Sequence, residues 1–241
     1  MSIKGALVIF VKTPGCSPIK TRLAHSIGKT LAEEFYIGCL AATAAYVKAV
    51  QMKLPGLAVY WAVAEKEGLE SPFWSDFPVI YQGEGNLGIR LSNVYREMLD
   101  RHEFACFIGA DSPHVQTDQV VLGVLESARA LKERFVIGET HDGGFYFFGG
   151  SIPVSESLWT SVEYSSPKTT NELRTRLISL GGIATIAKDF DIDTLDDLWR
   201  YRERHFDSEE FLPEQANIIR WARSLPFIAN SEGKLQNYLN F

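Results

Sequence analysis

Cysteine is scarce in this chain of 241 residues, which contains three of them. Cys16, Cys39 and Cys106 are odd in number and lack the close pairs that bind zinc, so neither a disulfide framework nor a zinc site is indicated. We expect free thiols in a reducing cytosol. Cys16 lies among basic residues, where a lowered pKa could make it a nucleophile, but no histidine partner is evident beside it.

Positive charge is also in deficit. Lysine and arginine number 24 against 30 acidic residues, which gives a formal net charge of −6. A protein that binds duplex nucleic acid by neutralising phosphates would need the opposite balance, so we expect no nucleic-acid partner. A nucleotide would instead be held by a few residues placed in a local pocket.

Long apolar runs are absent near the N-terminus. The run at residues 5–11 is too short for a signal sequence or a membrane span. We therefore expect a cytoplasmic protein without a membrane span. A hydrophobic fraction of 46% supports one substantial core. We expect one domain over residues 1–241, with a helical C-terminal extension from about residue 200.

One apolar segment organises the rest of the sequence. Residues 104–108 form an uninterrupted apolar run, followed by Gly109, Ala110, Asp111, Ser112 and Pro113. Such a run is typical of a parallel strand buried on both faces, and Pro113 prevents simple continuation of the strand. Asp111 would then lie at the carboxyl edge of a sheet, where open α/β sheets bind ligands. Alternatively, Asp111 caps the next helix or forms a turn with Ser112.

Apolar strands alternate with helical patterns along the chain. This alternation predicts a three-layer α/β/α Rossmann-like sandwich with a mainly parallel sheet and one antiparallel insertion near residue 145. We expect a loop over residues 149–166 and a helical, polar remainder from Tyr201. The expected strands cover residues 5–11, 56–63, 104–108, two segments within 135–148, and 183–187, and residues 73–81 are expected to form a short helix or turn and then a brief strand. The expected helices cover 23–50, a segment from Leu91, 118–129, 170–180 and a segment after Thr194.

A basic loop follows the first expected strand and contains Lys12, Lys20 and Arg22. Right-handed crossovers would bring this loop to the same sheet edge as Asp111. Cations in a loop at a helix start suit a phosphate, although a solvated basic surface is the alternative. The loop lacks the Gly-Lys-Ser/Thr of a P-loop. We expect the side chains of Lys20 and Arg22 to lie outside the core.

An acidic segment follows the last expected strand. Asp191 or Asp193 could share a Mg²⁺ or Mn²⁺ ion with Asp111, because these ions need few carboxylates when substrate oxygens complete the shell. Helix capping is the alternative. We expect Thr194 to be the N-cap of the next helix and to form a capping box with Asp197. We expect Asp196 to stabilise the start of the same helix.

A tight turn is expected at His141, Asp142, Gly143 and Gly144. The two glycines would permit positive φ and a close approach of the backbone to a ligand. Asp142 would either point into the site or cap the turn. His141 could titrate or bind a metal, but it has no second histidine nearby. The aromatic residues Trp61, Trp74 and 145–148 are expected mainly in the core rather than as platforms that stack on bases.

Five motifs together resemble the DUF2064 family, also called selenodomain-associated transferase 1, which consists of GT-A type transferases. The motifs appear in the family's order over about residues 5 to 198. They are residues 7–24, Gly85-Asn-Leu-Gly-Ile-Arg90, Ile108-Gly-Ala-Asp-Ser-Pro113, Asp142-Gly-Gly-Phe-Tyr146 and Asp191-Ile-Asp-Thr-Leu-Asp-Asp-Leu198. The resemblance implies a nucleotide-diphospho-sugar transferase fold and metal-assisted transfer of a glycosyl or nucleotidyl group from a nucleotide-sugar or nucleoside triphosphate to a small acceptor.

The resemblance also implies roles for particular residues. Asp111 and Asp193 would bind Mg²⁺ or Mn²⁺, and Asp111 and Lys20 would be catalytic. The nucleotide would contact Lys12, Gly15, Lys20, Arg22, Gly88, Arg90, Asp142, Gly143 and Gly144.

Three positions depart from the family pattern. An acid is usual at His114, a glutamate at His141 and an aspartate at Asn86. If the two histidines prevented metal capture, a non-catalytic module that binds a nucleotide-sugar would be the alternative. A phosphatase-like hydrolase that uses Asp111 as nucleophile ranks last, because the Asp-x-Asp-x-Thr/Val pattern is absent. The sugar, base, acceptor and oligomeric state stay open.

Overall fold

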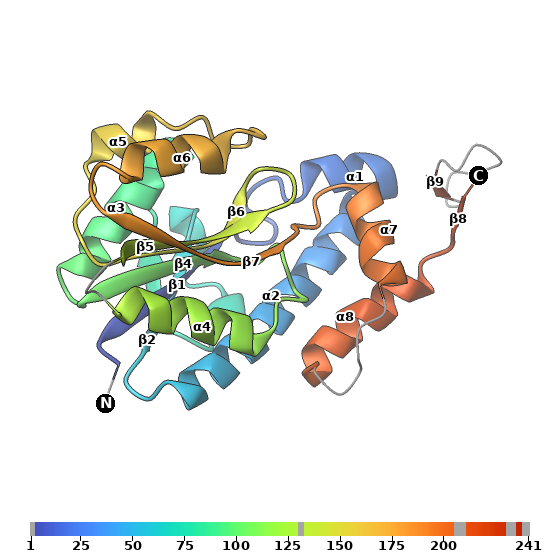
Figure 1. The fold of residues 1–241 in the computed structure, drawn as a ribbon. Coiled ribbons are helices and arrows are strands. Elements are labelled where there is room, and N and C mark those ends of the chain that lie inside the picture. Colours follow the sequence, from blue (N-terminus) through green and yellow to red (C-terminus); the bar gives the residue numbers. More distant parts are fainter. Residues whose placement is uncertain (1–2, 130–132, 205–210, 230–234, 238–241) are drawn as a thin grey trace.

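The computed structural model describes residues 3–129, 133–204, 211–229 and 235–237. Its main feature is a seven-stranded sheet in the order β3-β2-β1-β4-β6-β5-β7 (Figure 1). All neighbouring strands pair in parallel except at β6, which is antiparallel to both β4 and β5. The strands are β1 (Gly5–Val11), β2 (Ala58–Val63), β3 (Val79–Tyr81), β4 (Phe104–Gly109), β5 (Glu133–Thr140), β6 (Phe145–Gly150) and β7 (Gly182–Asp189).

Helices cover both faces of the sheet (Figure 1). One core cluster joins α2 and α4 to one face, and a second joins α3, α5 and α6 to the other. The predicted three-layer α/β class and the antiparallel strand near residue 145 are therefore confirmed. The helices are α1 (Thr21–Ile27), α2 (Lys29–Lys53), α3 (Leu87–Leu99), α4 (Thr117–Ala128), α5 (Glu156–Thr160), α6 (Thr169–Leu177), α7 (Leu195–Glu203) and α8 (Pro213–Ser224).

The central strand β4 is apolar because both of its faces are covered. Cys106 and Ile108 contribute to the core under α2 and α4, whereas Ala105 and Phe107 contribute to the core under α3. Side chains alternate between the faces of a strand, so a strand between two helical layers needs an apolar residue at every position. The carboxyl end of β4 then delivers Asp111 to the edge where the loops after β1 and β7 also emerge.

Three expectations about the helical segments were wrong in detail. The helix expected over residues 23–50 is split into α1 and α2 at Gly28, whose φ of 87° lies in the left-handed region that favours glycine. The loop expected over residues 149–166 contains the short helix α5. The C-terminal remainder contains a hairpin of β8 (Phe227–Ala229) and β9 (Leu235–Asn237) besides α8.

A third apolar cluster joins α1, α2, α7 and α8. Helix α2 alone is long and apolar enough to cross a membrane, judged by length and composition over the described residues. However, more than half of its most apolar window is buried, against the sheet on one side and α8 on the other. This burial explains its apolar composition as that of a core helix.

Candidate functional site at the carboxyl edge of the sheet

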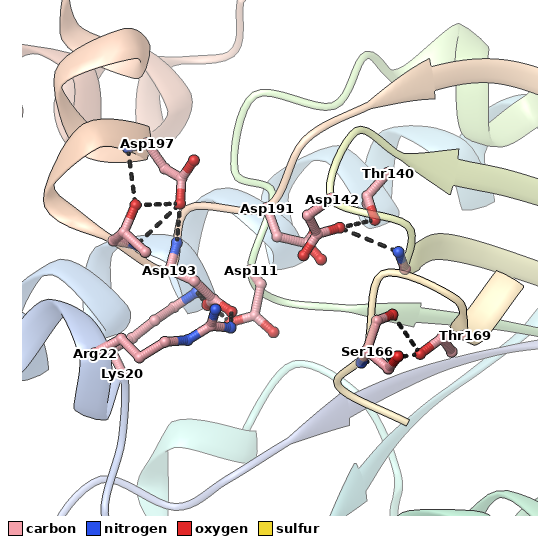
Figure 2. A network of polar contacts seen from close by, with 12 residues as sticks. Lys20, Arg22, Asp111, Thr140, Asp142, Ser166, Thr169, Asp191, Asp193 and Asp197 are labelled. Carbon is pink, nitrogen blue, oxygen red and sulfur yellow. Dashed lines mark hydrogen bonds and ion pairs between the residues drawn. The ribbon is translucent and has the colours of Figure 1, made fainter. Parts of the chain in front are cut away.

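A buried lysine joins two of the predicted site carboxylates. The Lys20 Nζ lies 2.6 Å from Asp111 Oδ1 and 2.9 Å from Asp193 Oδ1. Arg22 Nη2 lies 2.6 Å from the other oxygen of Asp193. Figure 2 shows both basic side chains extending toward the two aspartates. The structure thus brings together residues from the loops after β1, β4 and β7, as the crossover argument predicted.

Lys20 itself contradicts one expectation. Its side chain is 2% exposed, whereas that of Arg22 is 63% exposed, so the expectation that both lie outside the core holds for Arg22 alone. Lys20 precedes α1 in the left-handed conformation, with φ 46° and ψ 47°. A non-glycine residue pays a steric cost in this region. The backbone therefore turns at Lys20 in a way that directs its side chain inward toward Asp111.

The loop before Lys20 is held by Glu65, which follows β2. Its Oε2 accepts a hydrogen bond of 2.7 Å from the Thr13 backbone N–H, and its Oε1 accepts one from the Ser17 hydroxyl. The hydroxyl of Tyr36 on α2 accepts a bond of 2.9 Å from the Lys12 backbone N–H. These contacts hold the part of the basic loop from Lys12 to Ser17, and the sequence had indicated neither Glu65 nor Tyr36 for this role.

The ion pairs set the charge state of Lys20. Burial by itself would lower the pKa of the Lys20 ammonium, but the adjacent carboxylates of Asp111 and Asp193 outweigh it and raise the pKa above its ordinary value. Burial would likewise raise the pKa of Asp193, but Lys20 and Arg22 hold it below the ordinary range. Lys20 is therefore a fixed positive charge at the junction of the three loops.

Asp191 has the opposite electrostatic environment. Burial and the nearby negative charge of Asp111 raise the pKa of the Asp191 carboxyl to about 7, although the Ser112 hydroxyl donates a hydrogen bond of 2.6 Å to its Oδ1. The segment around Asp191 is joined to the end of β4 by a backbone bond of 3.1 Å from the Ile192 N–H to the Asp111 carbonyl. A cation placed between Asp111 and Asp191 would relieve their repulsion.

The residues assigned to the start of α7 have the predicted structural role. Thr194 caps the helix, and Asp197 completes a capping box through a bond of 3.0 Å from the Thr194 backbone N–H to its Oδ2. The Thr194 hydroxyl accepts a bond of 3.2 Å from the Asp197 N–H. This cap ends the segment that contains Asp191 and Asp193, so it fixes their place relative to β4.

Two adjoining cavities open at this edge, with volumes of about 930 Å³ and about 390 Å³. We call the first the basic cavity, because Lys12, Lys20, Arg22 and Arg90 all line it. We call the second the inner cavity; it extends over the ends of β1 and β4 toward the β5–β6 turn and the loop before α6. Both are lined by Phe10, Arg22, Leu87, Asp111, Ser165 and Asp193.

Four predicted nucleotide-contacting residues occupy different positions. Lys12 lines the basic cavity, but its Nζ donates to the Pro18 carbonyl at 3.1 Å. Arg90 lines the same cavity and donates from Nε to the Gly85 carbonyl at 3.0 Å. Gly15 has a φ of 85° and lines neither cavity. Gly88 packs against the backbone of α5, where a Cβ would come within 2.8 Å of the Trp159 carbonyl oxygen.

The β5–β6 turn packs against the loop before α6. Gly143 has a φ of 93°, as the turn pattern predicts, and a Cβ there would come within 2.0 Å of the Pro167 carbonyl oxygen. The close approach that requires this glycine is therefore to protein backbone. Asp142 caps the turn through a bond of 3.1 Å from the Gly144 N–H to its Oδ1. Asp142 and Gly144 also line the inner cavity.

The three departures from the family pattern lie outside the two cavities. His114 is 2% exposed, and its Nε2 lies 2.7 Å from Asp189 Oδ1. Burial lowers the pKa of His114 in spite of that carboxylate. His141 is exposed and contacts the end of β7 through its backbone N–H. Asn86 caps α3 by accepting a bond of 3.1 Å from the Ile89 N–H.

The structure also bears on the expectations about the cysteine and aromatic side chains. The three cysteines are free, and Cys39 and Cys106 are buried. The pKa of the exposed Cys16 is raised by desolvation and by Glu67 and Glu65, which argues against an activated nucleophile. Trp61 and Trp74 are buried in the core, as expected. Phe145 is partly exposed and lines the inner cavity.

Two further residues at the site gave no sequence signal. Ser165 has a φ of 58° and lines both cavities, although nothing in a Ser-Ser-Pro segment marks a left-handed serine. Gln215 on α8 is 1% exposed and donates from Nε2 to the carbonyls of Pro113 and Val115, at 2.8 Å and 3.1 Å. It thereby supports the segment that follows Asp111 from a position more than a hundred residues away.

A model of a protein family matches about half of this chain. The model described as "Uncharacterized protein conserved in bacteria (DUF2064)" matches residues 46–166, which include α3, β4, the β5–β6 turn and β6. The chain belongs to the DUF2064 family. The predicted resemblance is therefore confirmed. No similar sequence was found among curated proteins.

The similarity to solved structures covers more of this DUF2064 protein than the segment that the family model matches. A protein from Desulfovibrio desulfuricans G20, provisionally described as a nucleotide-diphospho-sugar transferase, superposes with a TM-score of 0.72 at 17% identity, over 92% of this chain and 99% of its own. Mannosyl-3-phosphoglycerate synthase from Rubrobacter xylanophilus superposes with a TM-score of 0.51 at 13% identity, over 97% of this chain and 84% of its own. At these identities the likeness establishes the fold alone.

Proposed function

We propose that this DUF2064 protein is a cytoplasmic, metal-dependent transferase that moves a glycosyl or nucleotidyl group from a nucleotide-sugar or nucleoside triphosphate to a small acceptor. The observation that carries the proposal is the basic cavity, where four cationic side chains face one end of a parallel sheet beside Asp111. Open α/β sheets bind ligands at this edge, and cations in a loop at a helix start favour phosphate groups. The fold is that of transferases in the two superposed structures.

Lys20 and Arg22 would contact the diphosphate of the donor. Both transfers have a diphosphate as leaving group, either as pyrophosphate or within a nucleoside diphosphate. Cations held in a partly water-excluded site stabilise the charge that develops on such a group. In the structure both cations are paired with Asp193, so phosphate binding requires them to exchange or share carboxylate partners.

A divalent ion fits the carboxylates at this site. Asp111 is half exposed, and Asp111 and Asp191 both line the inner cavity, where their oxygens are hard donors that suit such an ion. The nearby charge of Asp111 also raises the pKa of Asp191. No cluster of three or more protein ligands was found over the residues that the structure describes, so donor oxygens and water would complete the coordination. We propose Asp111 with Asp193 or Asp191 as the ligands of Mg²⁺ or Mn²⁺. The ion would polarise the phosphate oxygens of the donor.

The contacts of Asp193 determine which carboxylates that ion could bind. The Lys20 ammonium lies between Asp111 and Asp193, within hydrogen-bond distance of both. An ion that used both carboxylates would have to displace this ammonium, whereas an ion at Asp111 and Asp191 would not. A binding module without catalysis gains no support, because His114 and His141 lie outside both cavities.

The test is a panel of nucleoside triphosphates and nucleotide-sugars, measured by thermal shift with and without Mn²⁺. A ligand at 100 times its dissociation constant should stabilise the fold by about 2.7 kcal/mol. We expect at least one member to give a shift that increases with Mn²⁺ and to lose its transferable group when acceptors are added. If no member shifts the transition under either condition, the proposed function is wrong. A shift without turnover for any acceptor would leave the binding module as the function.

A further inference from the structure

The inner cavity differs in chemistry from the basic cavity. Its apolar walls come from Phe10, Leu87, Leu91, Phe107, Phe145 and Tyr164. Phe10 and Phe107 meet edge to face, with their ring centroids 4.9 Å apart. A volume of about 390 Å³ is at the small end of the range for binding sites of small molecules. The walls suit a small compound with an aromatic or otherwise apolar face.

Carboxylates dominate the charge of the inner cavity. Among the described residues that line it, Asp111, Asp142, Asp191 and Asp193 are acidic and only Arg22 is basic. Arg22 lines both cavities, and its Nη2 is paired with Asp193 at 2.6 Å. Figure 2 shows Asp142 on the side of the network occupied by Ser166 and Thr169, away from Lys20 and Arg22. The carboxylates that line the inner cavity therefore outnumber its cations by four to one, which disfavours an anion there.

We infer that the inner cavity is the acceptor site and that it takes a small uncharged or cationic hydroxyl compound with an apolar face, and excludes phosphorylated or carboxylated ones. The two cavities share Asp111, so a donor in the basic cavity and an acceptor in the inner cavity would meet there. Charge sorts the two substrates between the two cavities. Four cations and three carboxylates line the basic cavity, whereas one cation and four carboxylates line the inner cavity. This inference rests on the proposed function, because only a transferase has an acceptor.

The transfer that joins the two substrates is balanced. The acceptor hydroxyl oxygen forms a bond to the sugar carbon or to the α-phosphorus of the donor, and the bond from that atom to the diphosphate oxygen breaks. The electron pair of the broken bond stays on the diphosphate, which the cations of the basic cavity stabilise. The hydroxyl proton is released to water. No oxidant or further reactant is needed.

A charge series with one shared ring tests the inference. Tyramine, tyrosol and 4-hydroxyphenylacetate all carry a phenol, and their side chains are cationic, neutral and anionic. Their binding to the full chain is measured by ligand-observed NMR titration without nucleotide or metal, up to on the order of 10 mM. We expect tyramine and tyrosol to bind, and 4-hydroxyphenylacetate to bind at least roughly tenfold more weakly than tyramine, since it adds a charge near carboxylates.

Two variants place the binding in the inner cavity. Asp142→Asn keeps an oxygen that can accept the turn hydrogen bond from Gly144 but removes a charge, so the preference for tyramine over 4-hydroxyphenylacetate should fall roughly threefold to tenfold. Phe145→Leu shortens a partly exposed wall residue that lines the inner cavity but not the basic cavity, and should weaken tyrosol binding without changing the charge preference. Asp118→Asn is the matched control, because this aspartate is 81% exposed on α4 and pairs with Lys53.

Three results would overturn the inference. They are equal or tighter binding of 4-hydroxyphenylacetate, no binding of any of the three compounds, and a charge preference that is unchanged in Asp142→Asn. These results leave the nucleotide panel untouched, so the acceptor inference can fail while the proposed function stands. A negative nucleotide panel, in contrast, would remove the proposed function while the charge preference of the cavity could still be measured.

Discussion

The ammonium of Lys20 lies 2.6 Å from the carboxylate of Asp111, inside the protein and between two loops that follow different strands. A second carboxylate, from Asp193, lies 2.9 Å from the same nitrogen. Lys20 therefore joins these loops in the fold, and under the proposed function it would also contact a phosphate group. This relationship separates its expected behaviour from that of Arg22, which reaches Asp193 from the exposed side.

Lys20→Ala should destabilise the fold. It removes the cation from a buried group of charges and leaves Asp111 and Asp193 without it, so we expect a loss of about 1 to 3 kcal/mol in the free energy of unfolding. Urea denaturation measures the loss. Lys53→Ala removes a cation from an exposed pair with Asp118 and should change stability by less than about 0.5 kcal/mol. Equal effects of the two substitutions would contradict a buried role for Lys20.

Asp191→Asn should stabilise the protein at neutral pH. The folded state raises the pKa of Asp191 to about 7, so the folded state binds a proton that the unfolded state has lost between about pH 4 and pH 7. The favourable contribution of this proton is complete below about pH 4 and is lost as the pH rises through about 7. Chemical denaturation should show a gain on the order of 2 kcal/mol at about pH 8, and a smaller one at about pH 5.

Asp193→Asn is the control of opposite sign for that experiment. The pKa of Asp193 is lowered by Lys20 and Arg22 against the effect of burial, so its carboxylate stabilises the fold above its unfolded pKa and loses this effect as the pH falls. Its replacement should therefore cost stability at about pH 8. If both substitutions moved stability in the same direction at that pH, the two carboxylates would not have the opposed environments described.

Asp111→Asn should remove the effect of Mn²⁺ on nucleotide binding. The amide retains the shape of the side chain but is a weaker ligand for Mg²⁺ or Mn²⁺, so we expect the part of nucleotide affinity that depends on Mn²⁺ to disappear, together with turnover. Isothermal titration with and without Mn²⁺ separates this part from the remaining affinity for phosphate. A variant in which Mn²⁺ still enhances nucleotide binding to the normal extent would show that Asp111 is not a ligand.

Gln215→Leu should affect the site although Gln215 lines neither cavity. It leaves the carbonyls of Pro113 and Val115 without the buried amide that bonds them, at an expected cost of about 1 to 3 kcal/mol. Because this segment follows Asp111, nucleotide affinity measured in the presence of Mn²⁺ should fall as well. Asn217→Ala, at an exposed position of the same helix, should leave both quantities unchanged within about 0.5 kcal/mol. Normal nucleotide affinity in a folded Gln215→Leu variant would limit this residue to stability.

The sequence by itself determined the layered α/β architecture and the edge at which the site lies. Apolar runs of strand length alternate with helical patterns, and Asp111 lies just after one of these runs, at residues 104–108. Parallel strands must return by right-handed crossovers, so the loops after β1, β4 and β7 had to reach one edge. The Asp142-Gly143-Gly144 turn and the capping box at Thr194 were also readable, because both are local arrangements with specific residue requirements.

Only the tertiary structure decided what each polar residue does at that edge. Lys20 could not be recognised as buried, because its burial depends on a left-handed backbone and on carboxylates from two distant loops. Gly88 and Gly143 fit a ligand-binding pattern but approach protein backbone, and Glu65 and Gln215 hold the site without any motif. The ion pairs, the burial of Lys20 and the separation of the basic cavity from the inner cavity arise from contacts between segments far apart in the chain. Local sequence pattern and propensity do not encode such contacts.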